Sequence, residues 1–225
     1  MAGRSKQLQV PERRVLKLSS PQVSAREALD FARSAISEID PDWFLASLAA
    51  AGNLGLDGCL LASARSAWEF TYCRQGSNNF IGGFLFSDGT LSFQSQAMPA
   101  DTQPSALEGN WLDSREVAKI VIAEPDLSDL QEHKTLWMAL RATDDGNLFW
   151  EVFRDSHNVA ARQRARTTFG LDALTGEILS ESYERWDQSY KIKSVVRQRW
   201  KGGDWKDAES DSGDGATTDI SPSIH

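Results

Sequence analysis

Few side chains in this sequence have the types and the spacing that catalysis needs. The three histidines are His133, His157 and His225, and the sequence has no Gly-x-Ser-x-Gly elbow, His-Glu-x-x-His pair or phosphate-binding glycine loop. His133 ends an acidic run whose members are Glu124, Asp126, Asp129 and Glu132. Their spacing fits neither an EF-hand nor a zinc site. We predict no catalytic residue, cofactor or metal, and keep as an alternative an enzyme accessory subunit or hydrolase that uses the acidic loop around His133.

Basic residues gather in the second half of the chain. Residues 154–206 hold eleven basic and seven acidic side chains, whereas residues 1–153 hold thirteen and twenty. Because alternate residues of a strand share one face, these basic side chains are predicted to form an electropositive surface. It suits an acidic protein surface or a polyanion, and a solvated outer sheet face is the competing interpretation. The candidate partner-binding residues are Arg162, Arg164, Arg166, Lys191, Lys193, Arg197, Arg199 and Trp200.

Composition narrows the class of protein. The 225 residues carry a formal charge of −8, which argues against a general nucleic-acid coat, and eight Trp with ten Phe can fill a sizeable core. The basic N-terminus lacks the apolar run of a secretory signal, and the longest apolar stretch, residues 43–51, is too short to span a membrane. We therefore expect a cytoplasmic protein. Cys59 and Cys73 are expected to be reduced thiols, because they lack metal-site or redox spacing.

The first half predicts one helix, then strands. Residues 24–27, Ser-Ala-Arg-Glu, form a capping box, and apolar residues at helical spacing continue to residue 39. A second, short helix is predicted over residues 43–51, ending at Gly52. Strands follow at residues 66–74, 80–87 and 90–94, and Asp88-Gly89 favours a tight hairpin between the last two.

The second half repeats this order. A capping box at residues 113–116 opens a helix to residue 123, and five strand-like runs follow, separated by turns that include Asp155–Asn158: residues 135–142, 147–154, 162–171, 177–186 and 190–200. The two capping boxes are 89 residues apart, and the two Trp-Glu pairs are 82 residues apart. The turn glycines, Gly89 and Gly176, are separated by 87 residues. Three landmarks in one order at a nearly constant offset indicate a tandem duplication.

The clearest motif begins with Trp150-Glu151-Val152 and ends with residues 171–179, Leu-Asp-Ala-Leu-Thr-Gly-Glu-Ile-Leu. It resembles the PepSY pattern, in which a Trp-x-Val strand precedes a hydrophobic-Asp-Ala-x-Thr-Gly-Glu-hydrophobic hairpin. In the upstream copy Ser87-Asp88-Gly89 replaces the longer turn. The resemblance implies a small, cystatin-like, typically non-catalytic module, often exported and associated with peptidase inhibition or envelope proteins. The sequence departs from this pattern because no export signal is visible.

These observations predict an α+β protein of two cystatin/PepSY-like modules, each a helix packed on a curled antiparallel β-sheet. The expected divisions are a flexible arm (1–22), module 1 (23–97), a linker (98–112), module 2 (113–206) and a disordered acidic tail (207–225). The expected function is non-catalytic binding, scaffolding or inhibition, acting on a protein partner through a sheet face or edge. A polyanion or nucleic-acid binder that uses the basic strands is a further alternative.

Overall fold

The chain forms an α+β structure in which, among the described residues, two helices lie against one antiparallel sheet of eleven strands. This computed structural model describes residues 13–15, 18, 22–37, 42–62, 66–75, 77, 79–97, 105–124, 134–143, 145–159, 161–187, 190–198 and 206–208. The strand order in the sheet is β1-β5-β4-β3-β2-β6-β7-β8-β9-β10-β11. The sheet is therefore continuous across both predicted modules.

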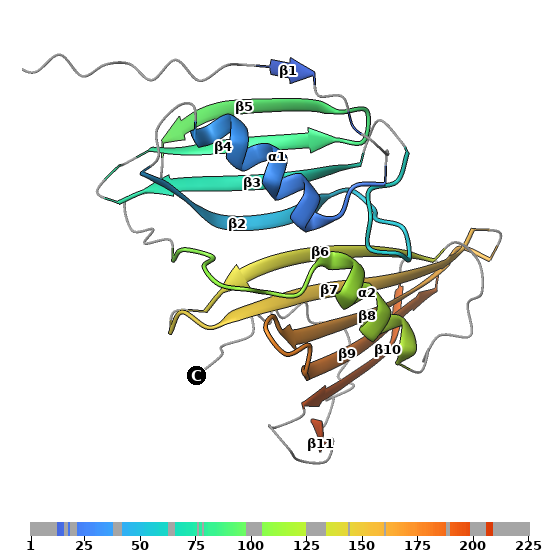
Figure 1. Cartoon of the computed structure of the whole chain (residues 1–225). Coiled ribbons are helices and arrows are strands. Elements are labelled where there is room, and N and C mark those ends of the chain that lie inside the picture. The colour runs from blue at the N-terminus through green and yellow to red at the C-terminus, as the bar shows by residue number, and fades with distance from the viewer. Residues whose placement is uncertain are drawn as a thin grey trace, which may run out of the picture.

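The first half contributes a helix and a four-stranded meander at one end of the sheet (Figure 1). The short strand β1 pairs with β5 at the outer edge, over three residues. Short edge strands of this kind limit unwanted pairing with other chains. The elements are β1 (Arg13–Val15), α1 (Ala25–Ser37), β2 (Trp43–Ala51), β3 (Ala67–Arg74), β4 (Asn79–Phe86) and β5 (Thr90–Ala97).

The second half follows the same order and continues the sheet. Strand β6 pairs with β2 through Leu48–Leu140 and Ala49–Ala139, so the two meanders meet along their first strands. The elements are α2 (Ser114–Ala123), β6 (Thr135–Ala142), β7 (Leu148–Asn158), β8 (Gln163–Asp172), β9 (Ile178–Asp187), β10 (Tyr190–Gln198) and β11 (Lys206–Ala208).

Both helices lie on the same face of the sheet, α1 over the first meander and α2 over the second (Figure 1). The core fills the space beneath them, because every second residue of each strand points there. Trp68 and Trp150 are fully buried in it, whereas Glu69 and Glu151 on the opposite face contact solvent. Each Trp-Glu pair therefore divides between the core and the surface.

The predicted helix over residues 43–51 is wrong, because this segment is β2, the strand that joins the two halves of the sheet. Its Leu and Ala residues favour a helix when isolated, but pairing on both sides satisfies the backbone as a strand. Leu48 and Ala50 face the core. The predicted turn at Asp155–Asn158 is also wrong, because these residues extend β7 and pair with Gln163–Arg166 of β8.

The second part of the predicted linker, residues 105–112, packs against the core. Leu107 and Trp111 are buried, and the Leu107 N–H donates to the carbonyl of Leu45 at 2.8 Å. Trp111 meets the ring of Trp150 edge-on, with ring centres 5.9 Å apart. This stretch is therefore part of the folded structure. Residues 98–104, most of the N-terminal arm and the tail beyond residue 208 lie outside the described residues.

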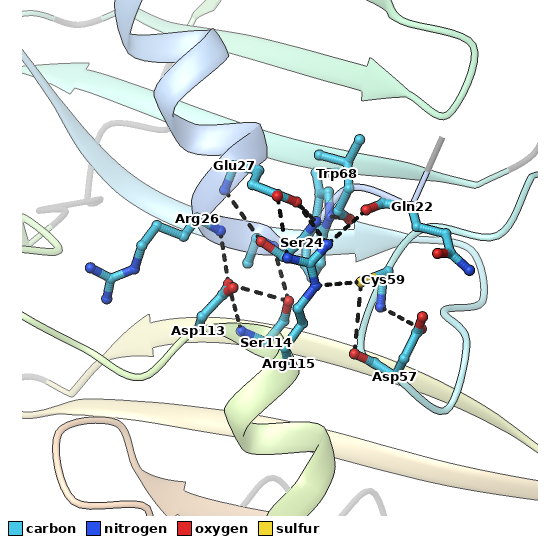
Figure 2. A network of polar contacts seen from close by, with 12 residues as sticks. Gln22, Ser24, Arg26, Glu27, Asp57, Cys59, Trp68, Asp113, Ser114 and Arg115 are labelled. Atoms are coloured by element: carbon cyan, nitrogen blue, oxygen red, sulfur yellow. Dashed lines mark hydrogen bonds and ion pairs between the residues drawn. The ribbon is translucent and has the colours of Figure 1, made fainter. Parts of the chain in front are cut away.

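The N-termini of the two helices meet at the junction between the halves (Figure 2). Each begins with its predicted capping box: Ser24 with Glu27 in α1, and Asp113 with Glu116 in α2. In addition, Asp113 Oδ1 accepts the Arg26 N–H of α1 at 3.0 Å and the Ser114 N–H of α2 at 2.8 Å. One carboxylate therefore caps both helices, where the positive ends of two helix dipoles would otherwise repel each other.

Arg115 links the junction to its surroundings (Figure 2). It forms an ion pair with Glu27 at 3.1 Å, and its Nη2 donates to the carbonyl of Gln22 at 2.9 Å. Its Nε donates to Cys59 Sγ at 3.1 Å. Arg115 therefore connects α2, the start of α1 and the loop after β2.

Substituting the shared cap is expected to destabilise the whole chain. Asp113→Ala removes the acceptor for N–H groups of both helices, so we expect a loss of about 2–3 kcal/mol in the free energy of unfolding. Chemical denaturation measures it. Asp113→Asn keeps an acceptor oxygen and should cost less than half as much. Equal losses in the two variants would contradict the double-capping role.

Candidate interaction surface

The sheet face opposite the helices, here called the open face, is built by the strand residues that alternate with the core. In the described part of the chain, both helices lie on the other side of the sheet. Burial alternates strictly along β7, where fully buried residues are followed by half-buried ones. The half-buried aromatic residues of this face include Phe80, Phe84, Phe86, Trp137, Phe149, Phe153 and Trp186. An exposed aromatic surface of this kind is typical of protein interaction sites.

Aromatic and Arg side chains stack on each other in the second half of the open face. Trp137 of β6 and Phe153 of β7 are direct cross-strand partners, and their rings stack with centres 4.6 Å apart. Arg166 of β8 lies 4.5 Å from the centre of the Phe153 ring, and Arg164 lies 4.2 Å from that of Trp186. This packing holds the rings in fixed positions without burying them.

The first half adds a second aromatic group. Phe84 and Phe86 of β4 lie on the same face with ring centres 6.2 Å apart. Between the two groups, β3 and β2 present Glu69, Thr71, Ser47 and Ala49, whereas Ala139 of β6 is buried. The open face therefore has aromatic residues on both sides of a strip of small and polar ones.

Two ion pairs lie on the open face. Both Arg166 nitrogens Nε and Nη2 donate to Asp155, at 2.7 and 2.8 Å, in a bidentate ion pair. This hydrogen bond outweighs the effect of burial and raises the pKa of Arg166. Arg141 pairs with Glu151 at 3.4 Å. Two of the arginines on this face are thus neutralised locally, which weakens the case for a polyanion and favours apolar contact.

The structure brings only some of the predicted basic residues together. Arg164 and Arg166 lie on one face of β8, as predicted. Arg162 does not join them, because β8 begins at Gln163 and Arg162 occupies the preceding turn with φ of 52°. Lys191 and Lys193 lie on β10, and a register shift falls between them in the pairing of β10 with β9. Arg197 lies on β10, and Arg199 and Trp200 lie outside the described residues.

The residues of the enzyme alternative are mostly not described. Asp126, Asp129, Glu132 and His133 lie outside the described residues, so that alternative stays a prediction. His157 lies on β7 and pairs across the sheet with Arg164. Where the structure describes the chain, it contains no group of three His, Cys, Asp or Glu side chains that could hold a metal. Among the helices in that part, none has the length and apolar character needed to cross a membrane.

Both cysteines are buried and free, and neither is poised for reaction. Burial raises the pKa of Cys73 to about 11, and it raises that of Cys59 despite the hydrogen bond from Arg115. At pH 8 both groups are neutral thiols shielded from solvent, so we expect iodoacetamide to label the native protein at least about 100-fold more slowly than the unfolded chain. Mass spectrometry of time points measures the rates. Rapid labelling of either residue under native conditions would contradict this burial.

The comparisons with known proteins are sparse. No protein-family model matches the chain, and no curated protein is significantly similar to it. Among solved structures, that of a candidate lipoprotein from Clostridium difficile 630 is similar over 72% of this chain and 94% of that chain, with 10% sequence identity and a TM-score of 0.48. At this distance the likeness assigns no function.

Proposed function

We propose that this chain is a non-catalytic binding protein that acts on a protein partner through the open face of its sheet. The observation that supports this most is the stack of Trp137, Phe153 and Arg166, which holds large, half-exposed aromatic groups in a fixed arrangement. Rigid, half-exposed aromatic and Arg side chains lose little conformational entropy on binding, and they dominate the energetics of many protein interfaces. Scaffolding and inhibition of an enzyme are both compatible with such binding.

We further propose that the chain is a tandem duplication of a PepSY-like, cystatin-type module. One repeated detail supports this proposal beyond the shared element order. Trp68 Nε1 donates to the carbonyl of Val23 at 3.0 Å, and Trp150 Nε1 donates to the carbonyl of Leu112 at 3.0 Å. In each case the acceptor immediately precedes the capping box of the helix, so the same indole anchors the same helix end in both halves.

The chemistry of the open face defines the partner we propose. Its aromatic residues call for apolar side chains, and its internally paired charges offer little long-range attraction. The partner is therefore a folded protein with an apolar, aromatic-rich surface of low net charge. Binding to it should depend only weakly on salt, whereas polyanion binding falls steeply as salt increases.

Comparative affinity capture tests this function. Immobilised wild-type protein, an open-face variant (Trp137→Ser with Phe84→Ser) and a helix-side variant (Lys119→Ser) are incubated with native lysate at 0.1 and 0.5 M NaCl. We expect the wild type and the helix-side variant to retain one or a few proteins at both salt concentrations. The open-face variant should not retain these proteins. Circular dichroism of the three proteins shows that they are folded.

Two other results would redirect the assignment. Retention of nucleic acid or acidic proteins that disappears at 0.5 M NaCl would favour the polyanion alternative. Equal retention of the same proteins by all three forms would show that the open face is not the binding surface. For the enzyme alternative, loss of an activity on His133→Ala substitution or on addition of a chelator is the corresponding test.

A further inference from the structure

One arginine of the open face lacks a counter-charge. Strands β6 to β9 place three arginines on that face, and two of them are paired: Arg141 with Glu151, and Arg166 with Asp155. The third is Arg164 of β8, which has neither a hydrogen-bond partner nor an ion-pair partner in the described part of the chain. Its charge is therefore available to a group outside this chain.

Stacking holds the Arg164 side chain in place. Its cross-strand partners are His157 of β7 and Trp186 of β9, and its guanidinium carbon lies 4.2 Å from the centre of the Trp186 ring. The Nε of Arg164 is buried without a hydrogen bond, whereas Nη1 and Nη2 are not among the enclosed atoms. The guanidinium is thus partly desolvated and already oriented, so it loses little conformational freedom when an acceptor binds its terminal nitrogens.

The neighbouring charges indicate how much negative charge the site accepts. Two residues along β8, Arg166 has Asp155 and Glu184 as its cross-strand partners. That row of the open face therefore holds two carboxylates for one guanidinium. A run of phosphates placed on Arg164 would bring further negative charge toward them, whereas one carboxylate can take two parallel hydrogen bonds from the guanidinium alone. The site suits a single carboxylate.

We propose that Arg164 is a specificity-determining residue of the open face and binds one Asp or Glu side chain of the protein partner, a role which rests on the function proposed above. The partner's carboxylate would accept hydrogen bonds from Arg164 Nη1 and Nη2, while apolar residues around it contact the rings of Trp137 and Phe153. A competing protein without this carboxylate would leave the guanidinium covered and unpaired. The contact therefore discriminates between partners with otherwise similar apolar surfaces.

Three blocked peptides that differ in one group test this chemistry: acetyl-Trp-Glu-Leu-amide, its Gln counterpart and its phosphoserine counterpart. Nuclear magnetic resonance follows the indole N–H signal of Trp186, assigned by comparison with Trp186→Phe. The Glu peptide should shift this signal, and the Gln peptide should bind at least about fivefold more weakly. Tighter binding of the phosphoserine peptide than of the Glu peptide would overturn the assignment to a carboxylate.

Two arginine variants separate a specific contact from a general effect of charge. Arg164→Gln should abolish the preference for the Glu peptide over the Gln peptide. Arg162→Gln removes the same charge from an exposed residue of the preceding turn and should leave the preference within about twofold of the wild type. Thermal denaturation shows that both variants are folded. The proposal is overturned if no peptide moves the Trp186 signal at about 10 mM, if the Glu and Gln peptides bind equally, or if the two variants behave alike.

The purified partner distinguishes this role of Arg164 from the function of the open face. Arg164→Gln should raise the Kd for the partner at least about fivefold, and Arg162→Gln should leave it within about twofold. If binding requires Trp137 but is unchanged by Arg164→Gln, the proposed function stands and the role of Arg164 is wrong. If the Glu peptide requires Arg164 but the partner requires neither Trp137 nor Phe84, the proposed function fails and the carboxylate site remains.

Discussion

Trp150→Ala is expected to destabilise the protein by about 3–5 kcal/mol, the range for large aromatic residues in a core. The side chain is fully buried, it anchors the start of α2 through the Leu112 carbonyl, and its ring packs edge-on against Trp111. The substitution therefore leaves a cavity and an unpaired carbonyl at the same place. The free energy of unfolding, measured by urea denaturation with the slope m compared between proteins, gives the effect.

Trp137→Ala is the matched control for this prediction. It removes the same type of side chain from the neighbouring strand, but from the open face, where the ring is half-buried. We expect a loss of about 1–2 kcal/mol, because the ring packs against the edge of the core and stacks on Phe153. A Trp150→Ala midpoint equal to that of the wild type would mean that the indole is not part of the core, and the account of how α2 is held would fail.

The same Trp137 substitution is expected to have a large effect on binding. Once the partner is purified, Trp137→Ala should raise the Kd at least about 30-fold, which corresponds to about 2 kcal/mol, the usual threshold for a residue that dominates an interface. Phe84→Ala should also raise the Kd, because Phe84 lies in the other aromatic group of the open face. Isothermal titration calorimetry measures both.

A helix-side substitution controls for indirect effects on binding. Lys119→Ala changes an exposed side chain of α2 and should leave the Kd within about twofold of the wild type. If Lys119→Ala weakens binding as much as Trp137→Ala does, the partner does not dock on the open face. If neither changes the Kd, the interface lies elsewhere, for example along the sheet edge formed by β1.

Much of the fold could be predicted because local signals agree with the final structure. The capping boxes at Ser24 and Asp113 are present as predicted, and the helix bounds differ by at most two residues from those expected. The hairpin at residues 171–179 forms as expected, with Gly176 at φ of 76° and Asp172 Oδ1 accepting the N–H groups of Leu174 and Thr175 at 2.9 Å. In each case residues close in sequence determine the geometry.

Strand β2 could not be predicted from its own residues, since Leu and Ala favour a helix and only its partners β3 and β6 make it a strand. The similar order of elements in the two halves could have indicated this strand. In the second half, a strand at Thr135–Ala142 precedes the Trp150 strand, so a strand before Trp68 was to be expected. Residues 52–66 lengthen the connection and obscure this correspondence.

The candidate surface was harder to predict than the fold. Alternation along β7 places Phe149, Glu151 and Phe153 on one face, which the sequence alone indicates. The stacking of Trp137 on Phe153 and the ion pair of Arg166 with Asp155 depend on the register between strands. When the register between the strands is not known, the arginines of β8 suggest an electropositive surface. The observed register shows that Arg166 is paired with Asp155, so the aromatic residues are the more prominent feature of this face.

Site-specific photo-cross-linking tests the central claim, that the open face binds the protein partner. A benzophenone amino acid is placed at Phe84 and Phe153 on the open face, and at Ser34 and Lys119 on the helices. In native cells, the account predicts that both open-face positions cross-link to the same protein, and that neither helix position does so. Cross-links to that protein from Ser34 and Lys119 but not from Phe84 or Phe153 would contradict the account.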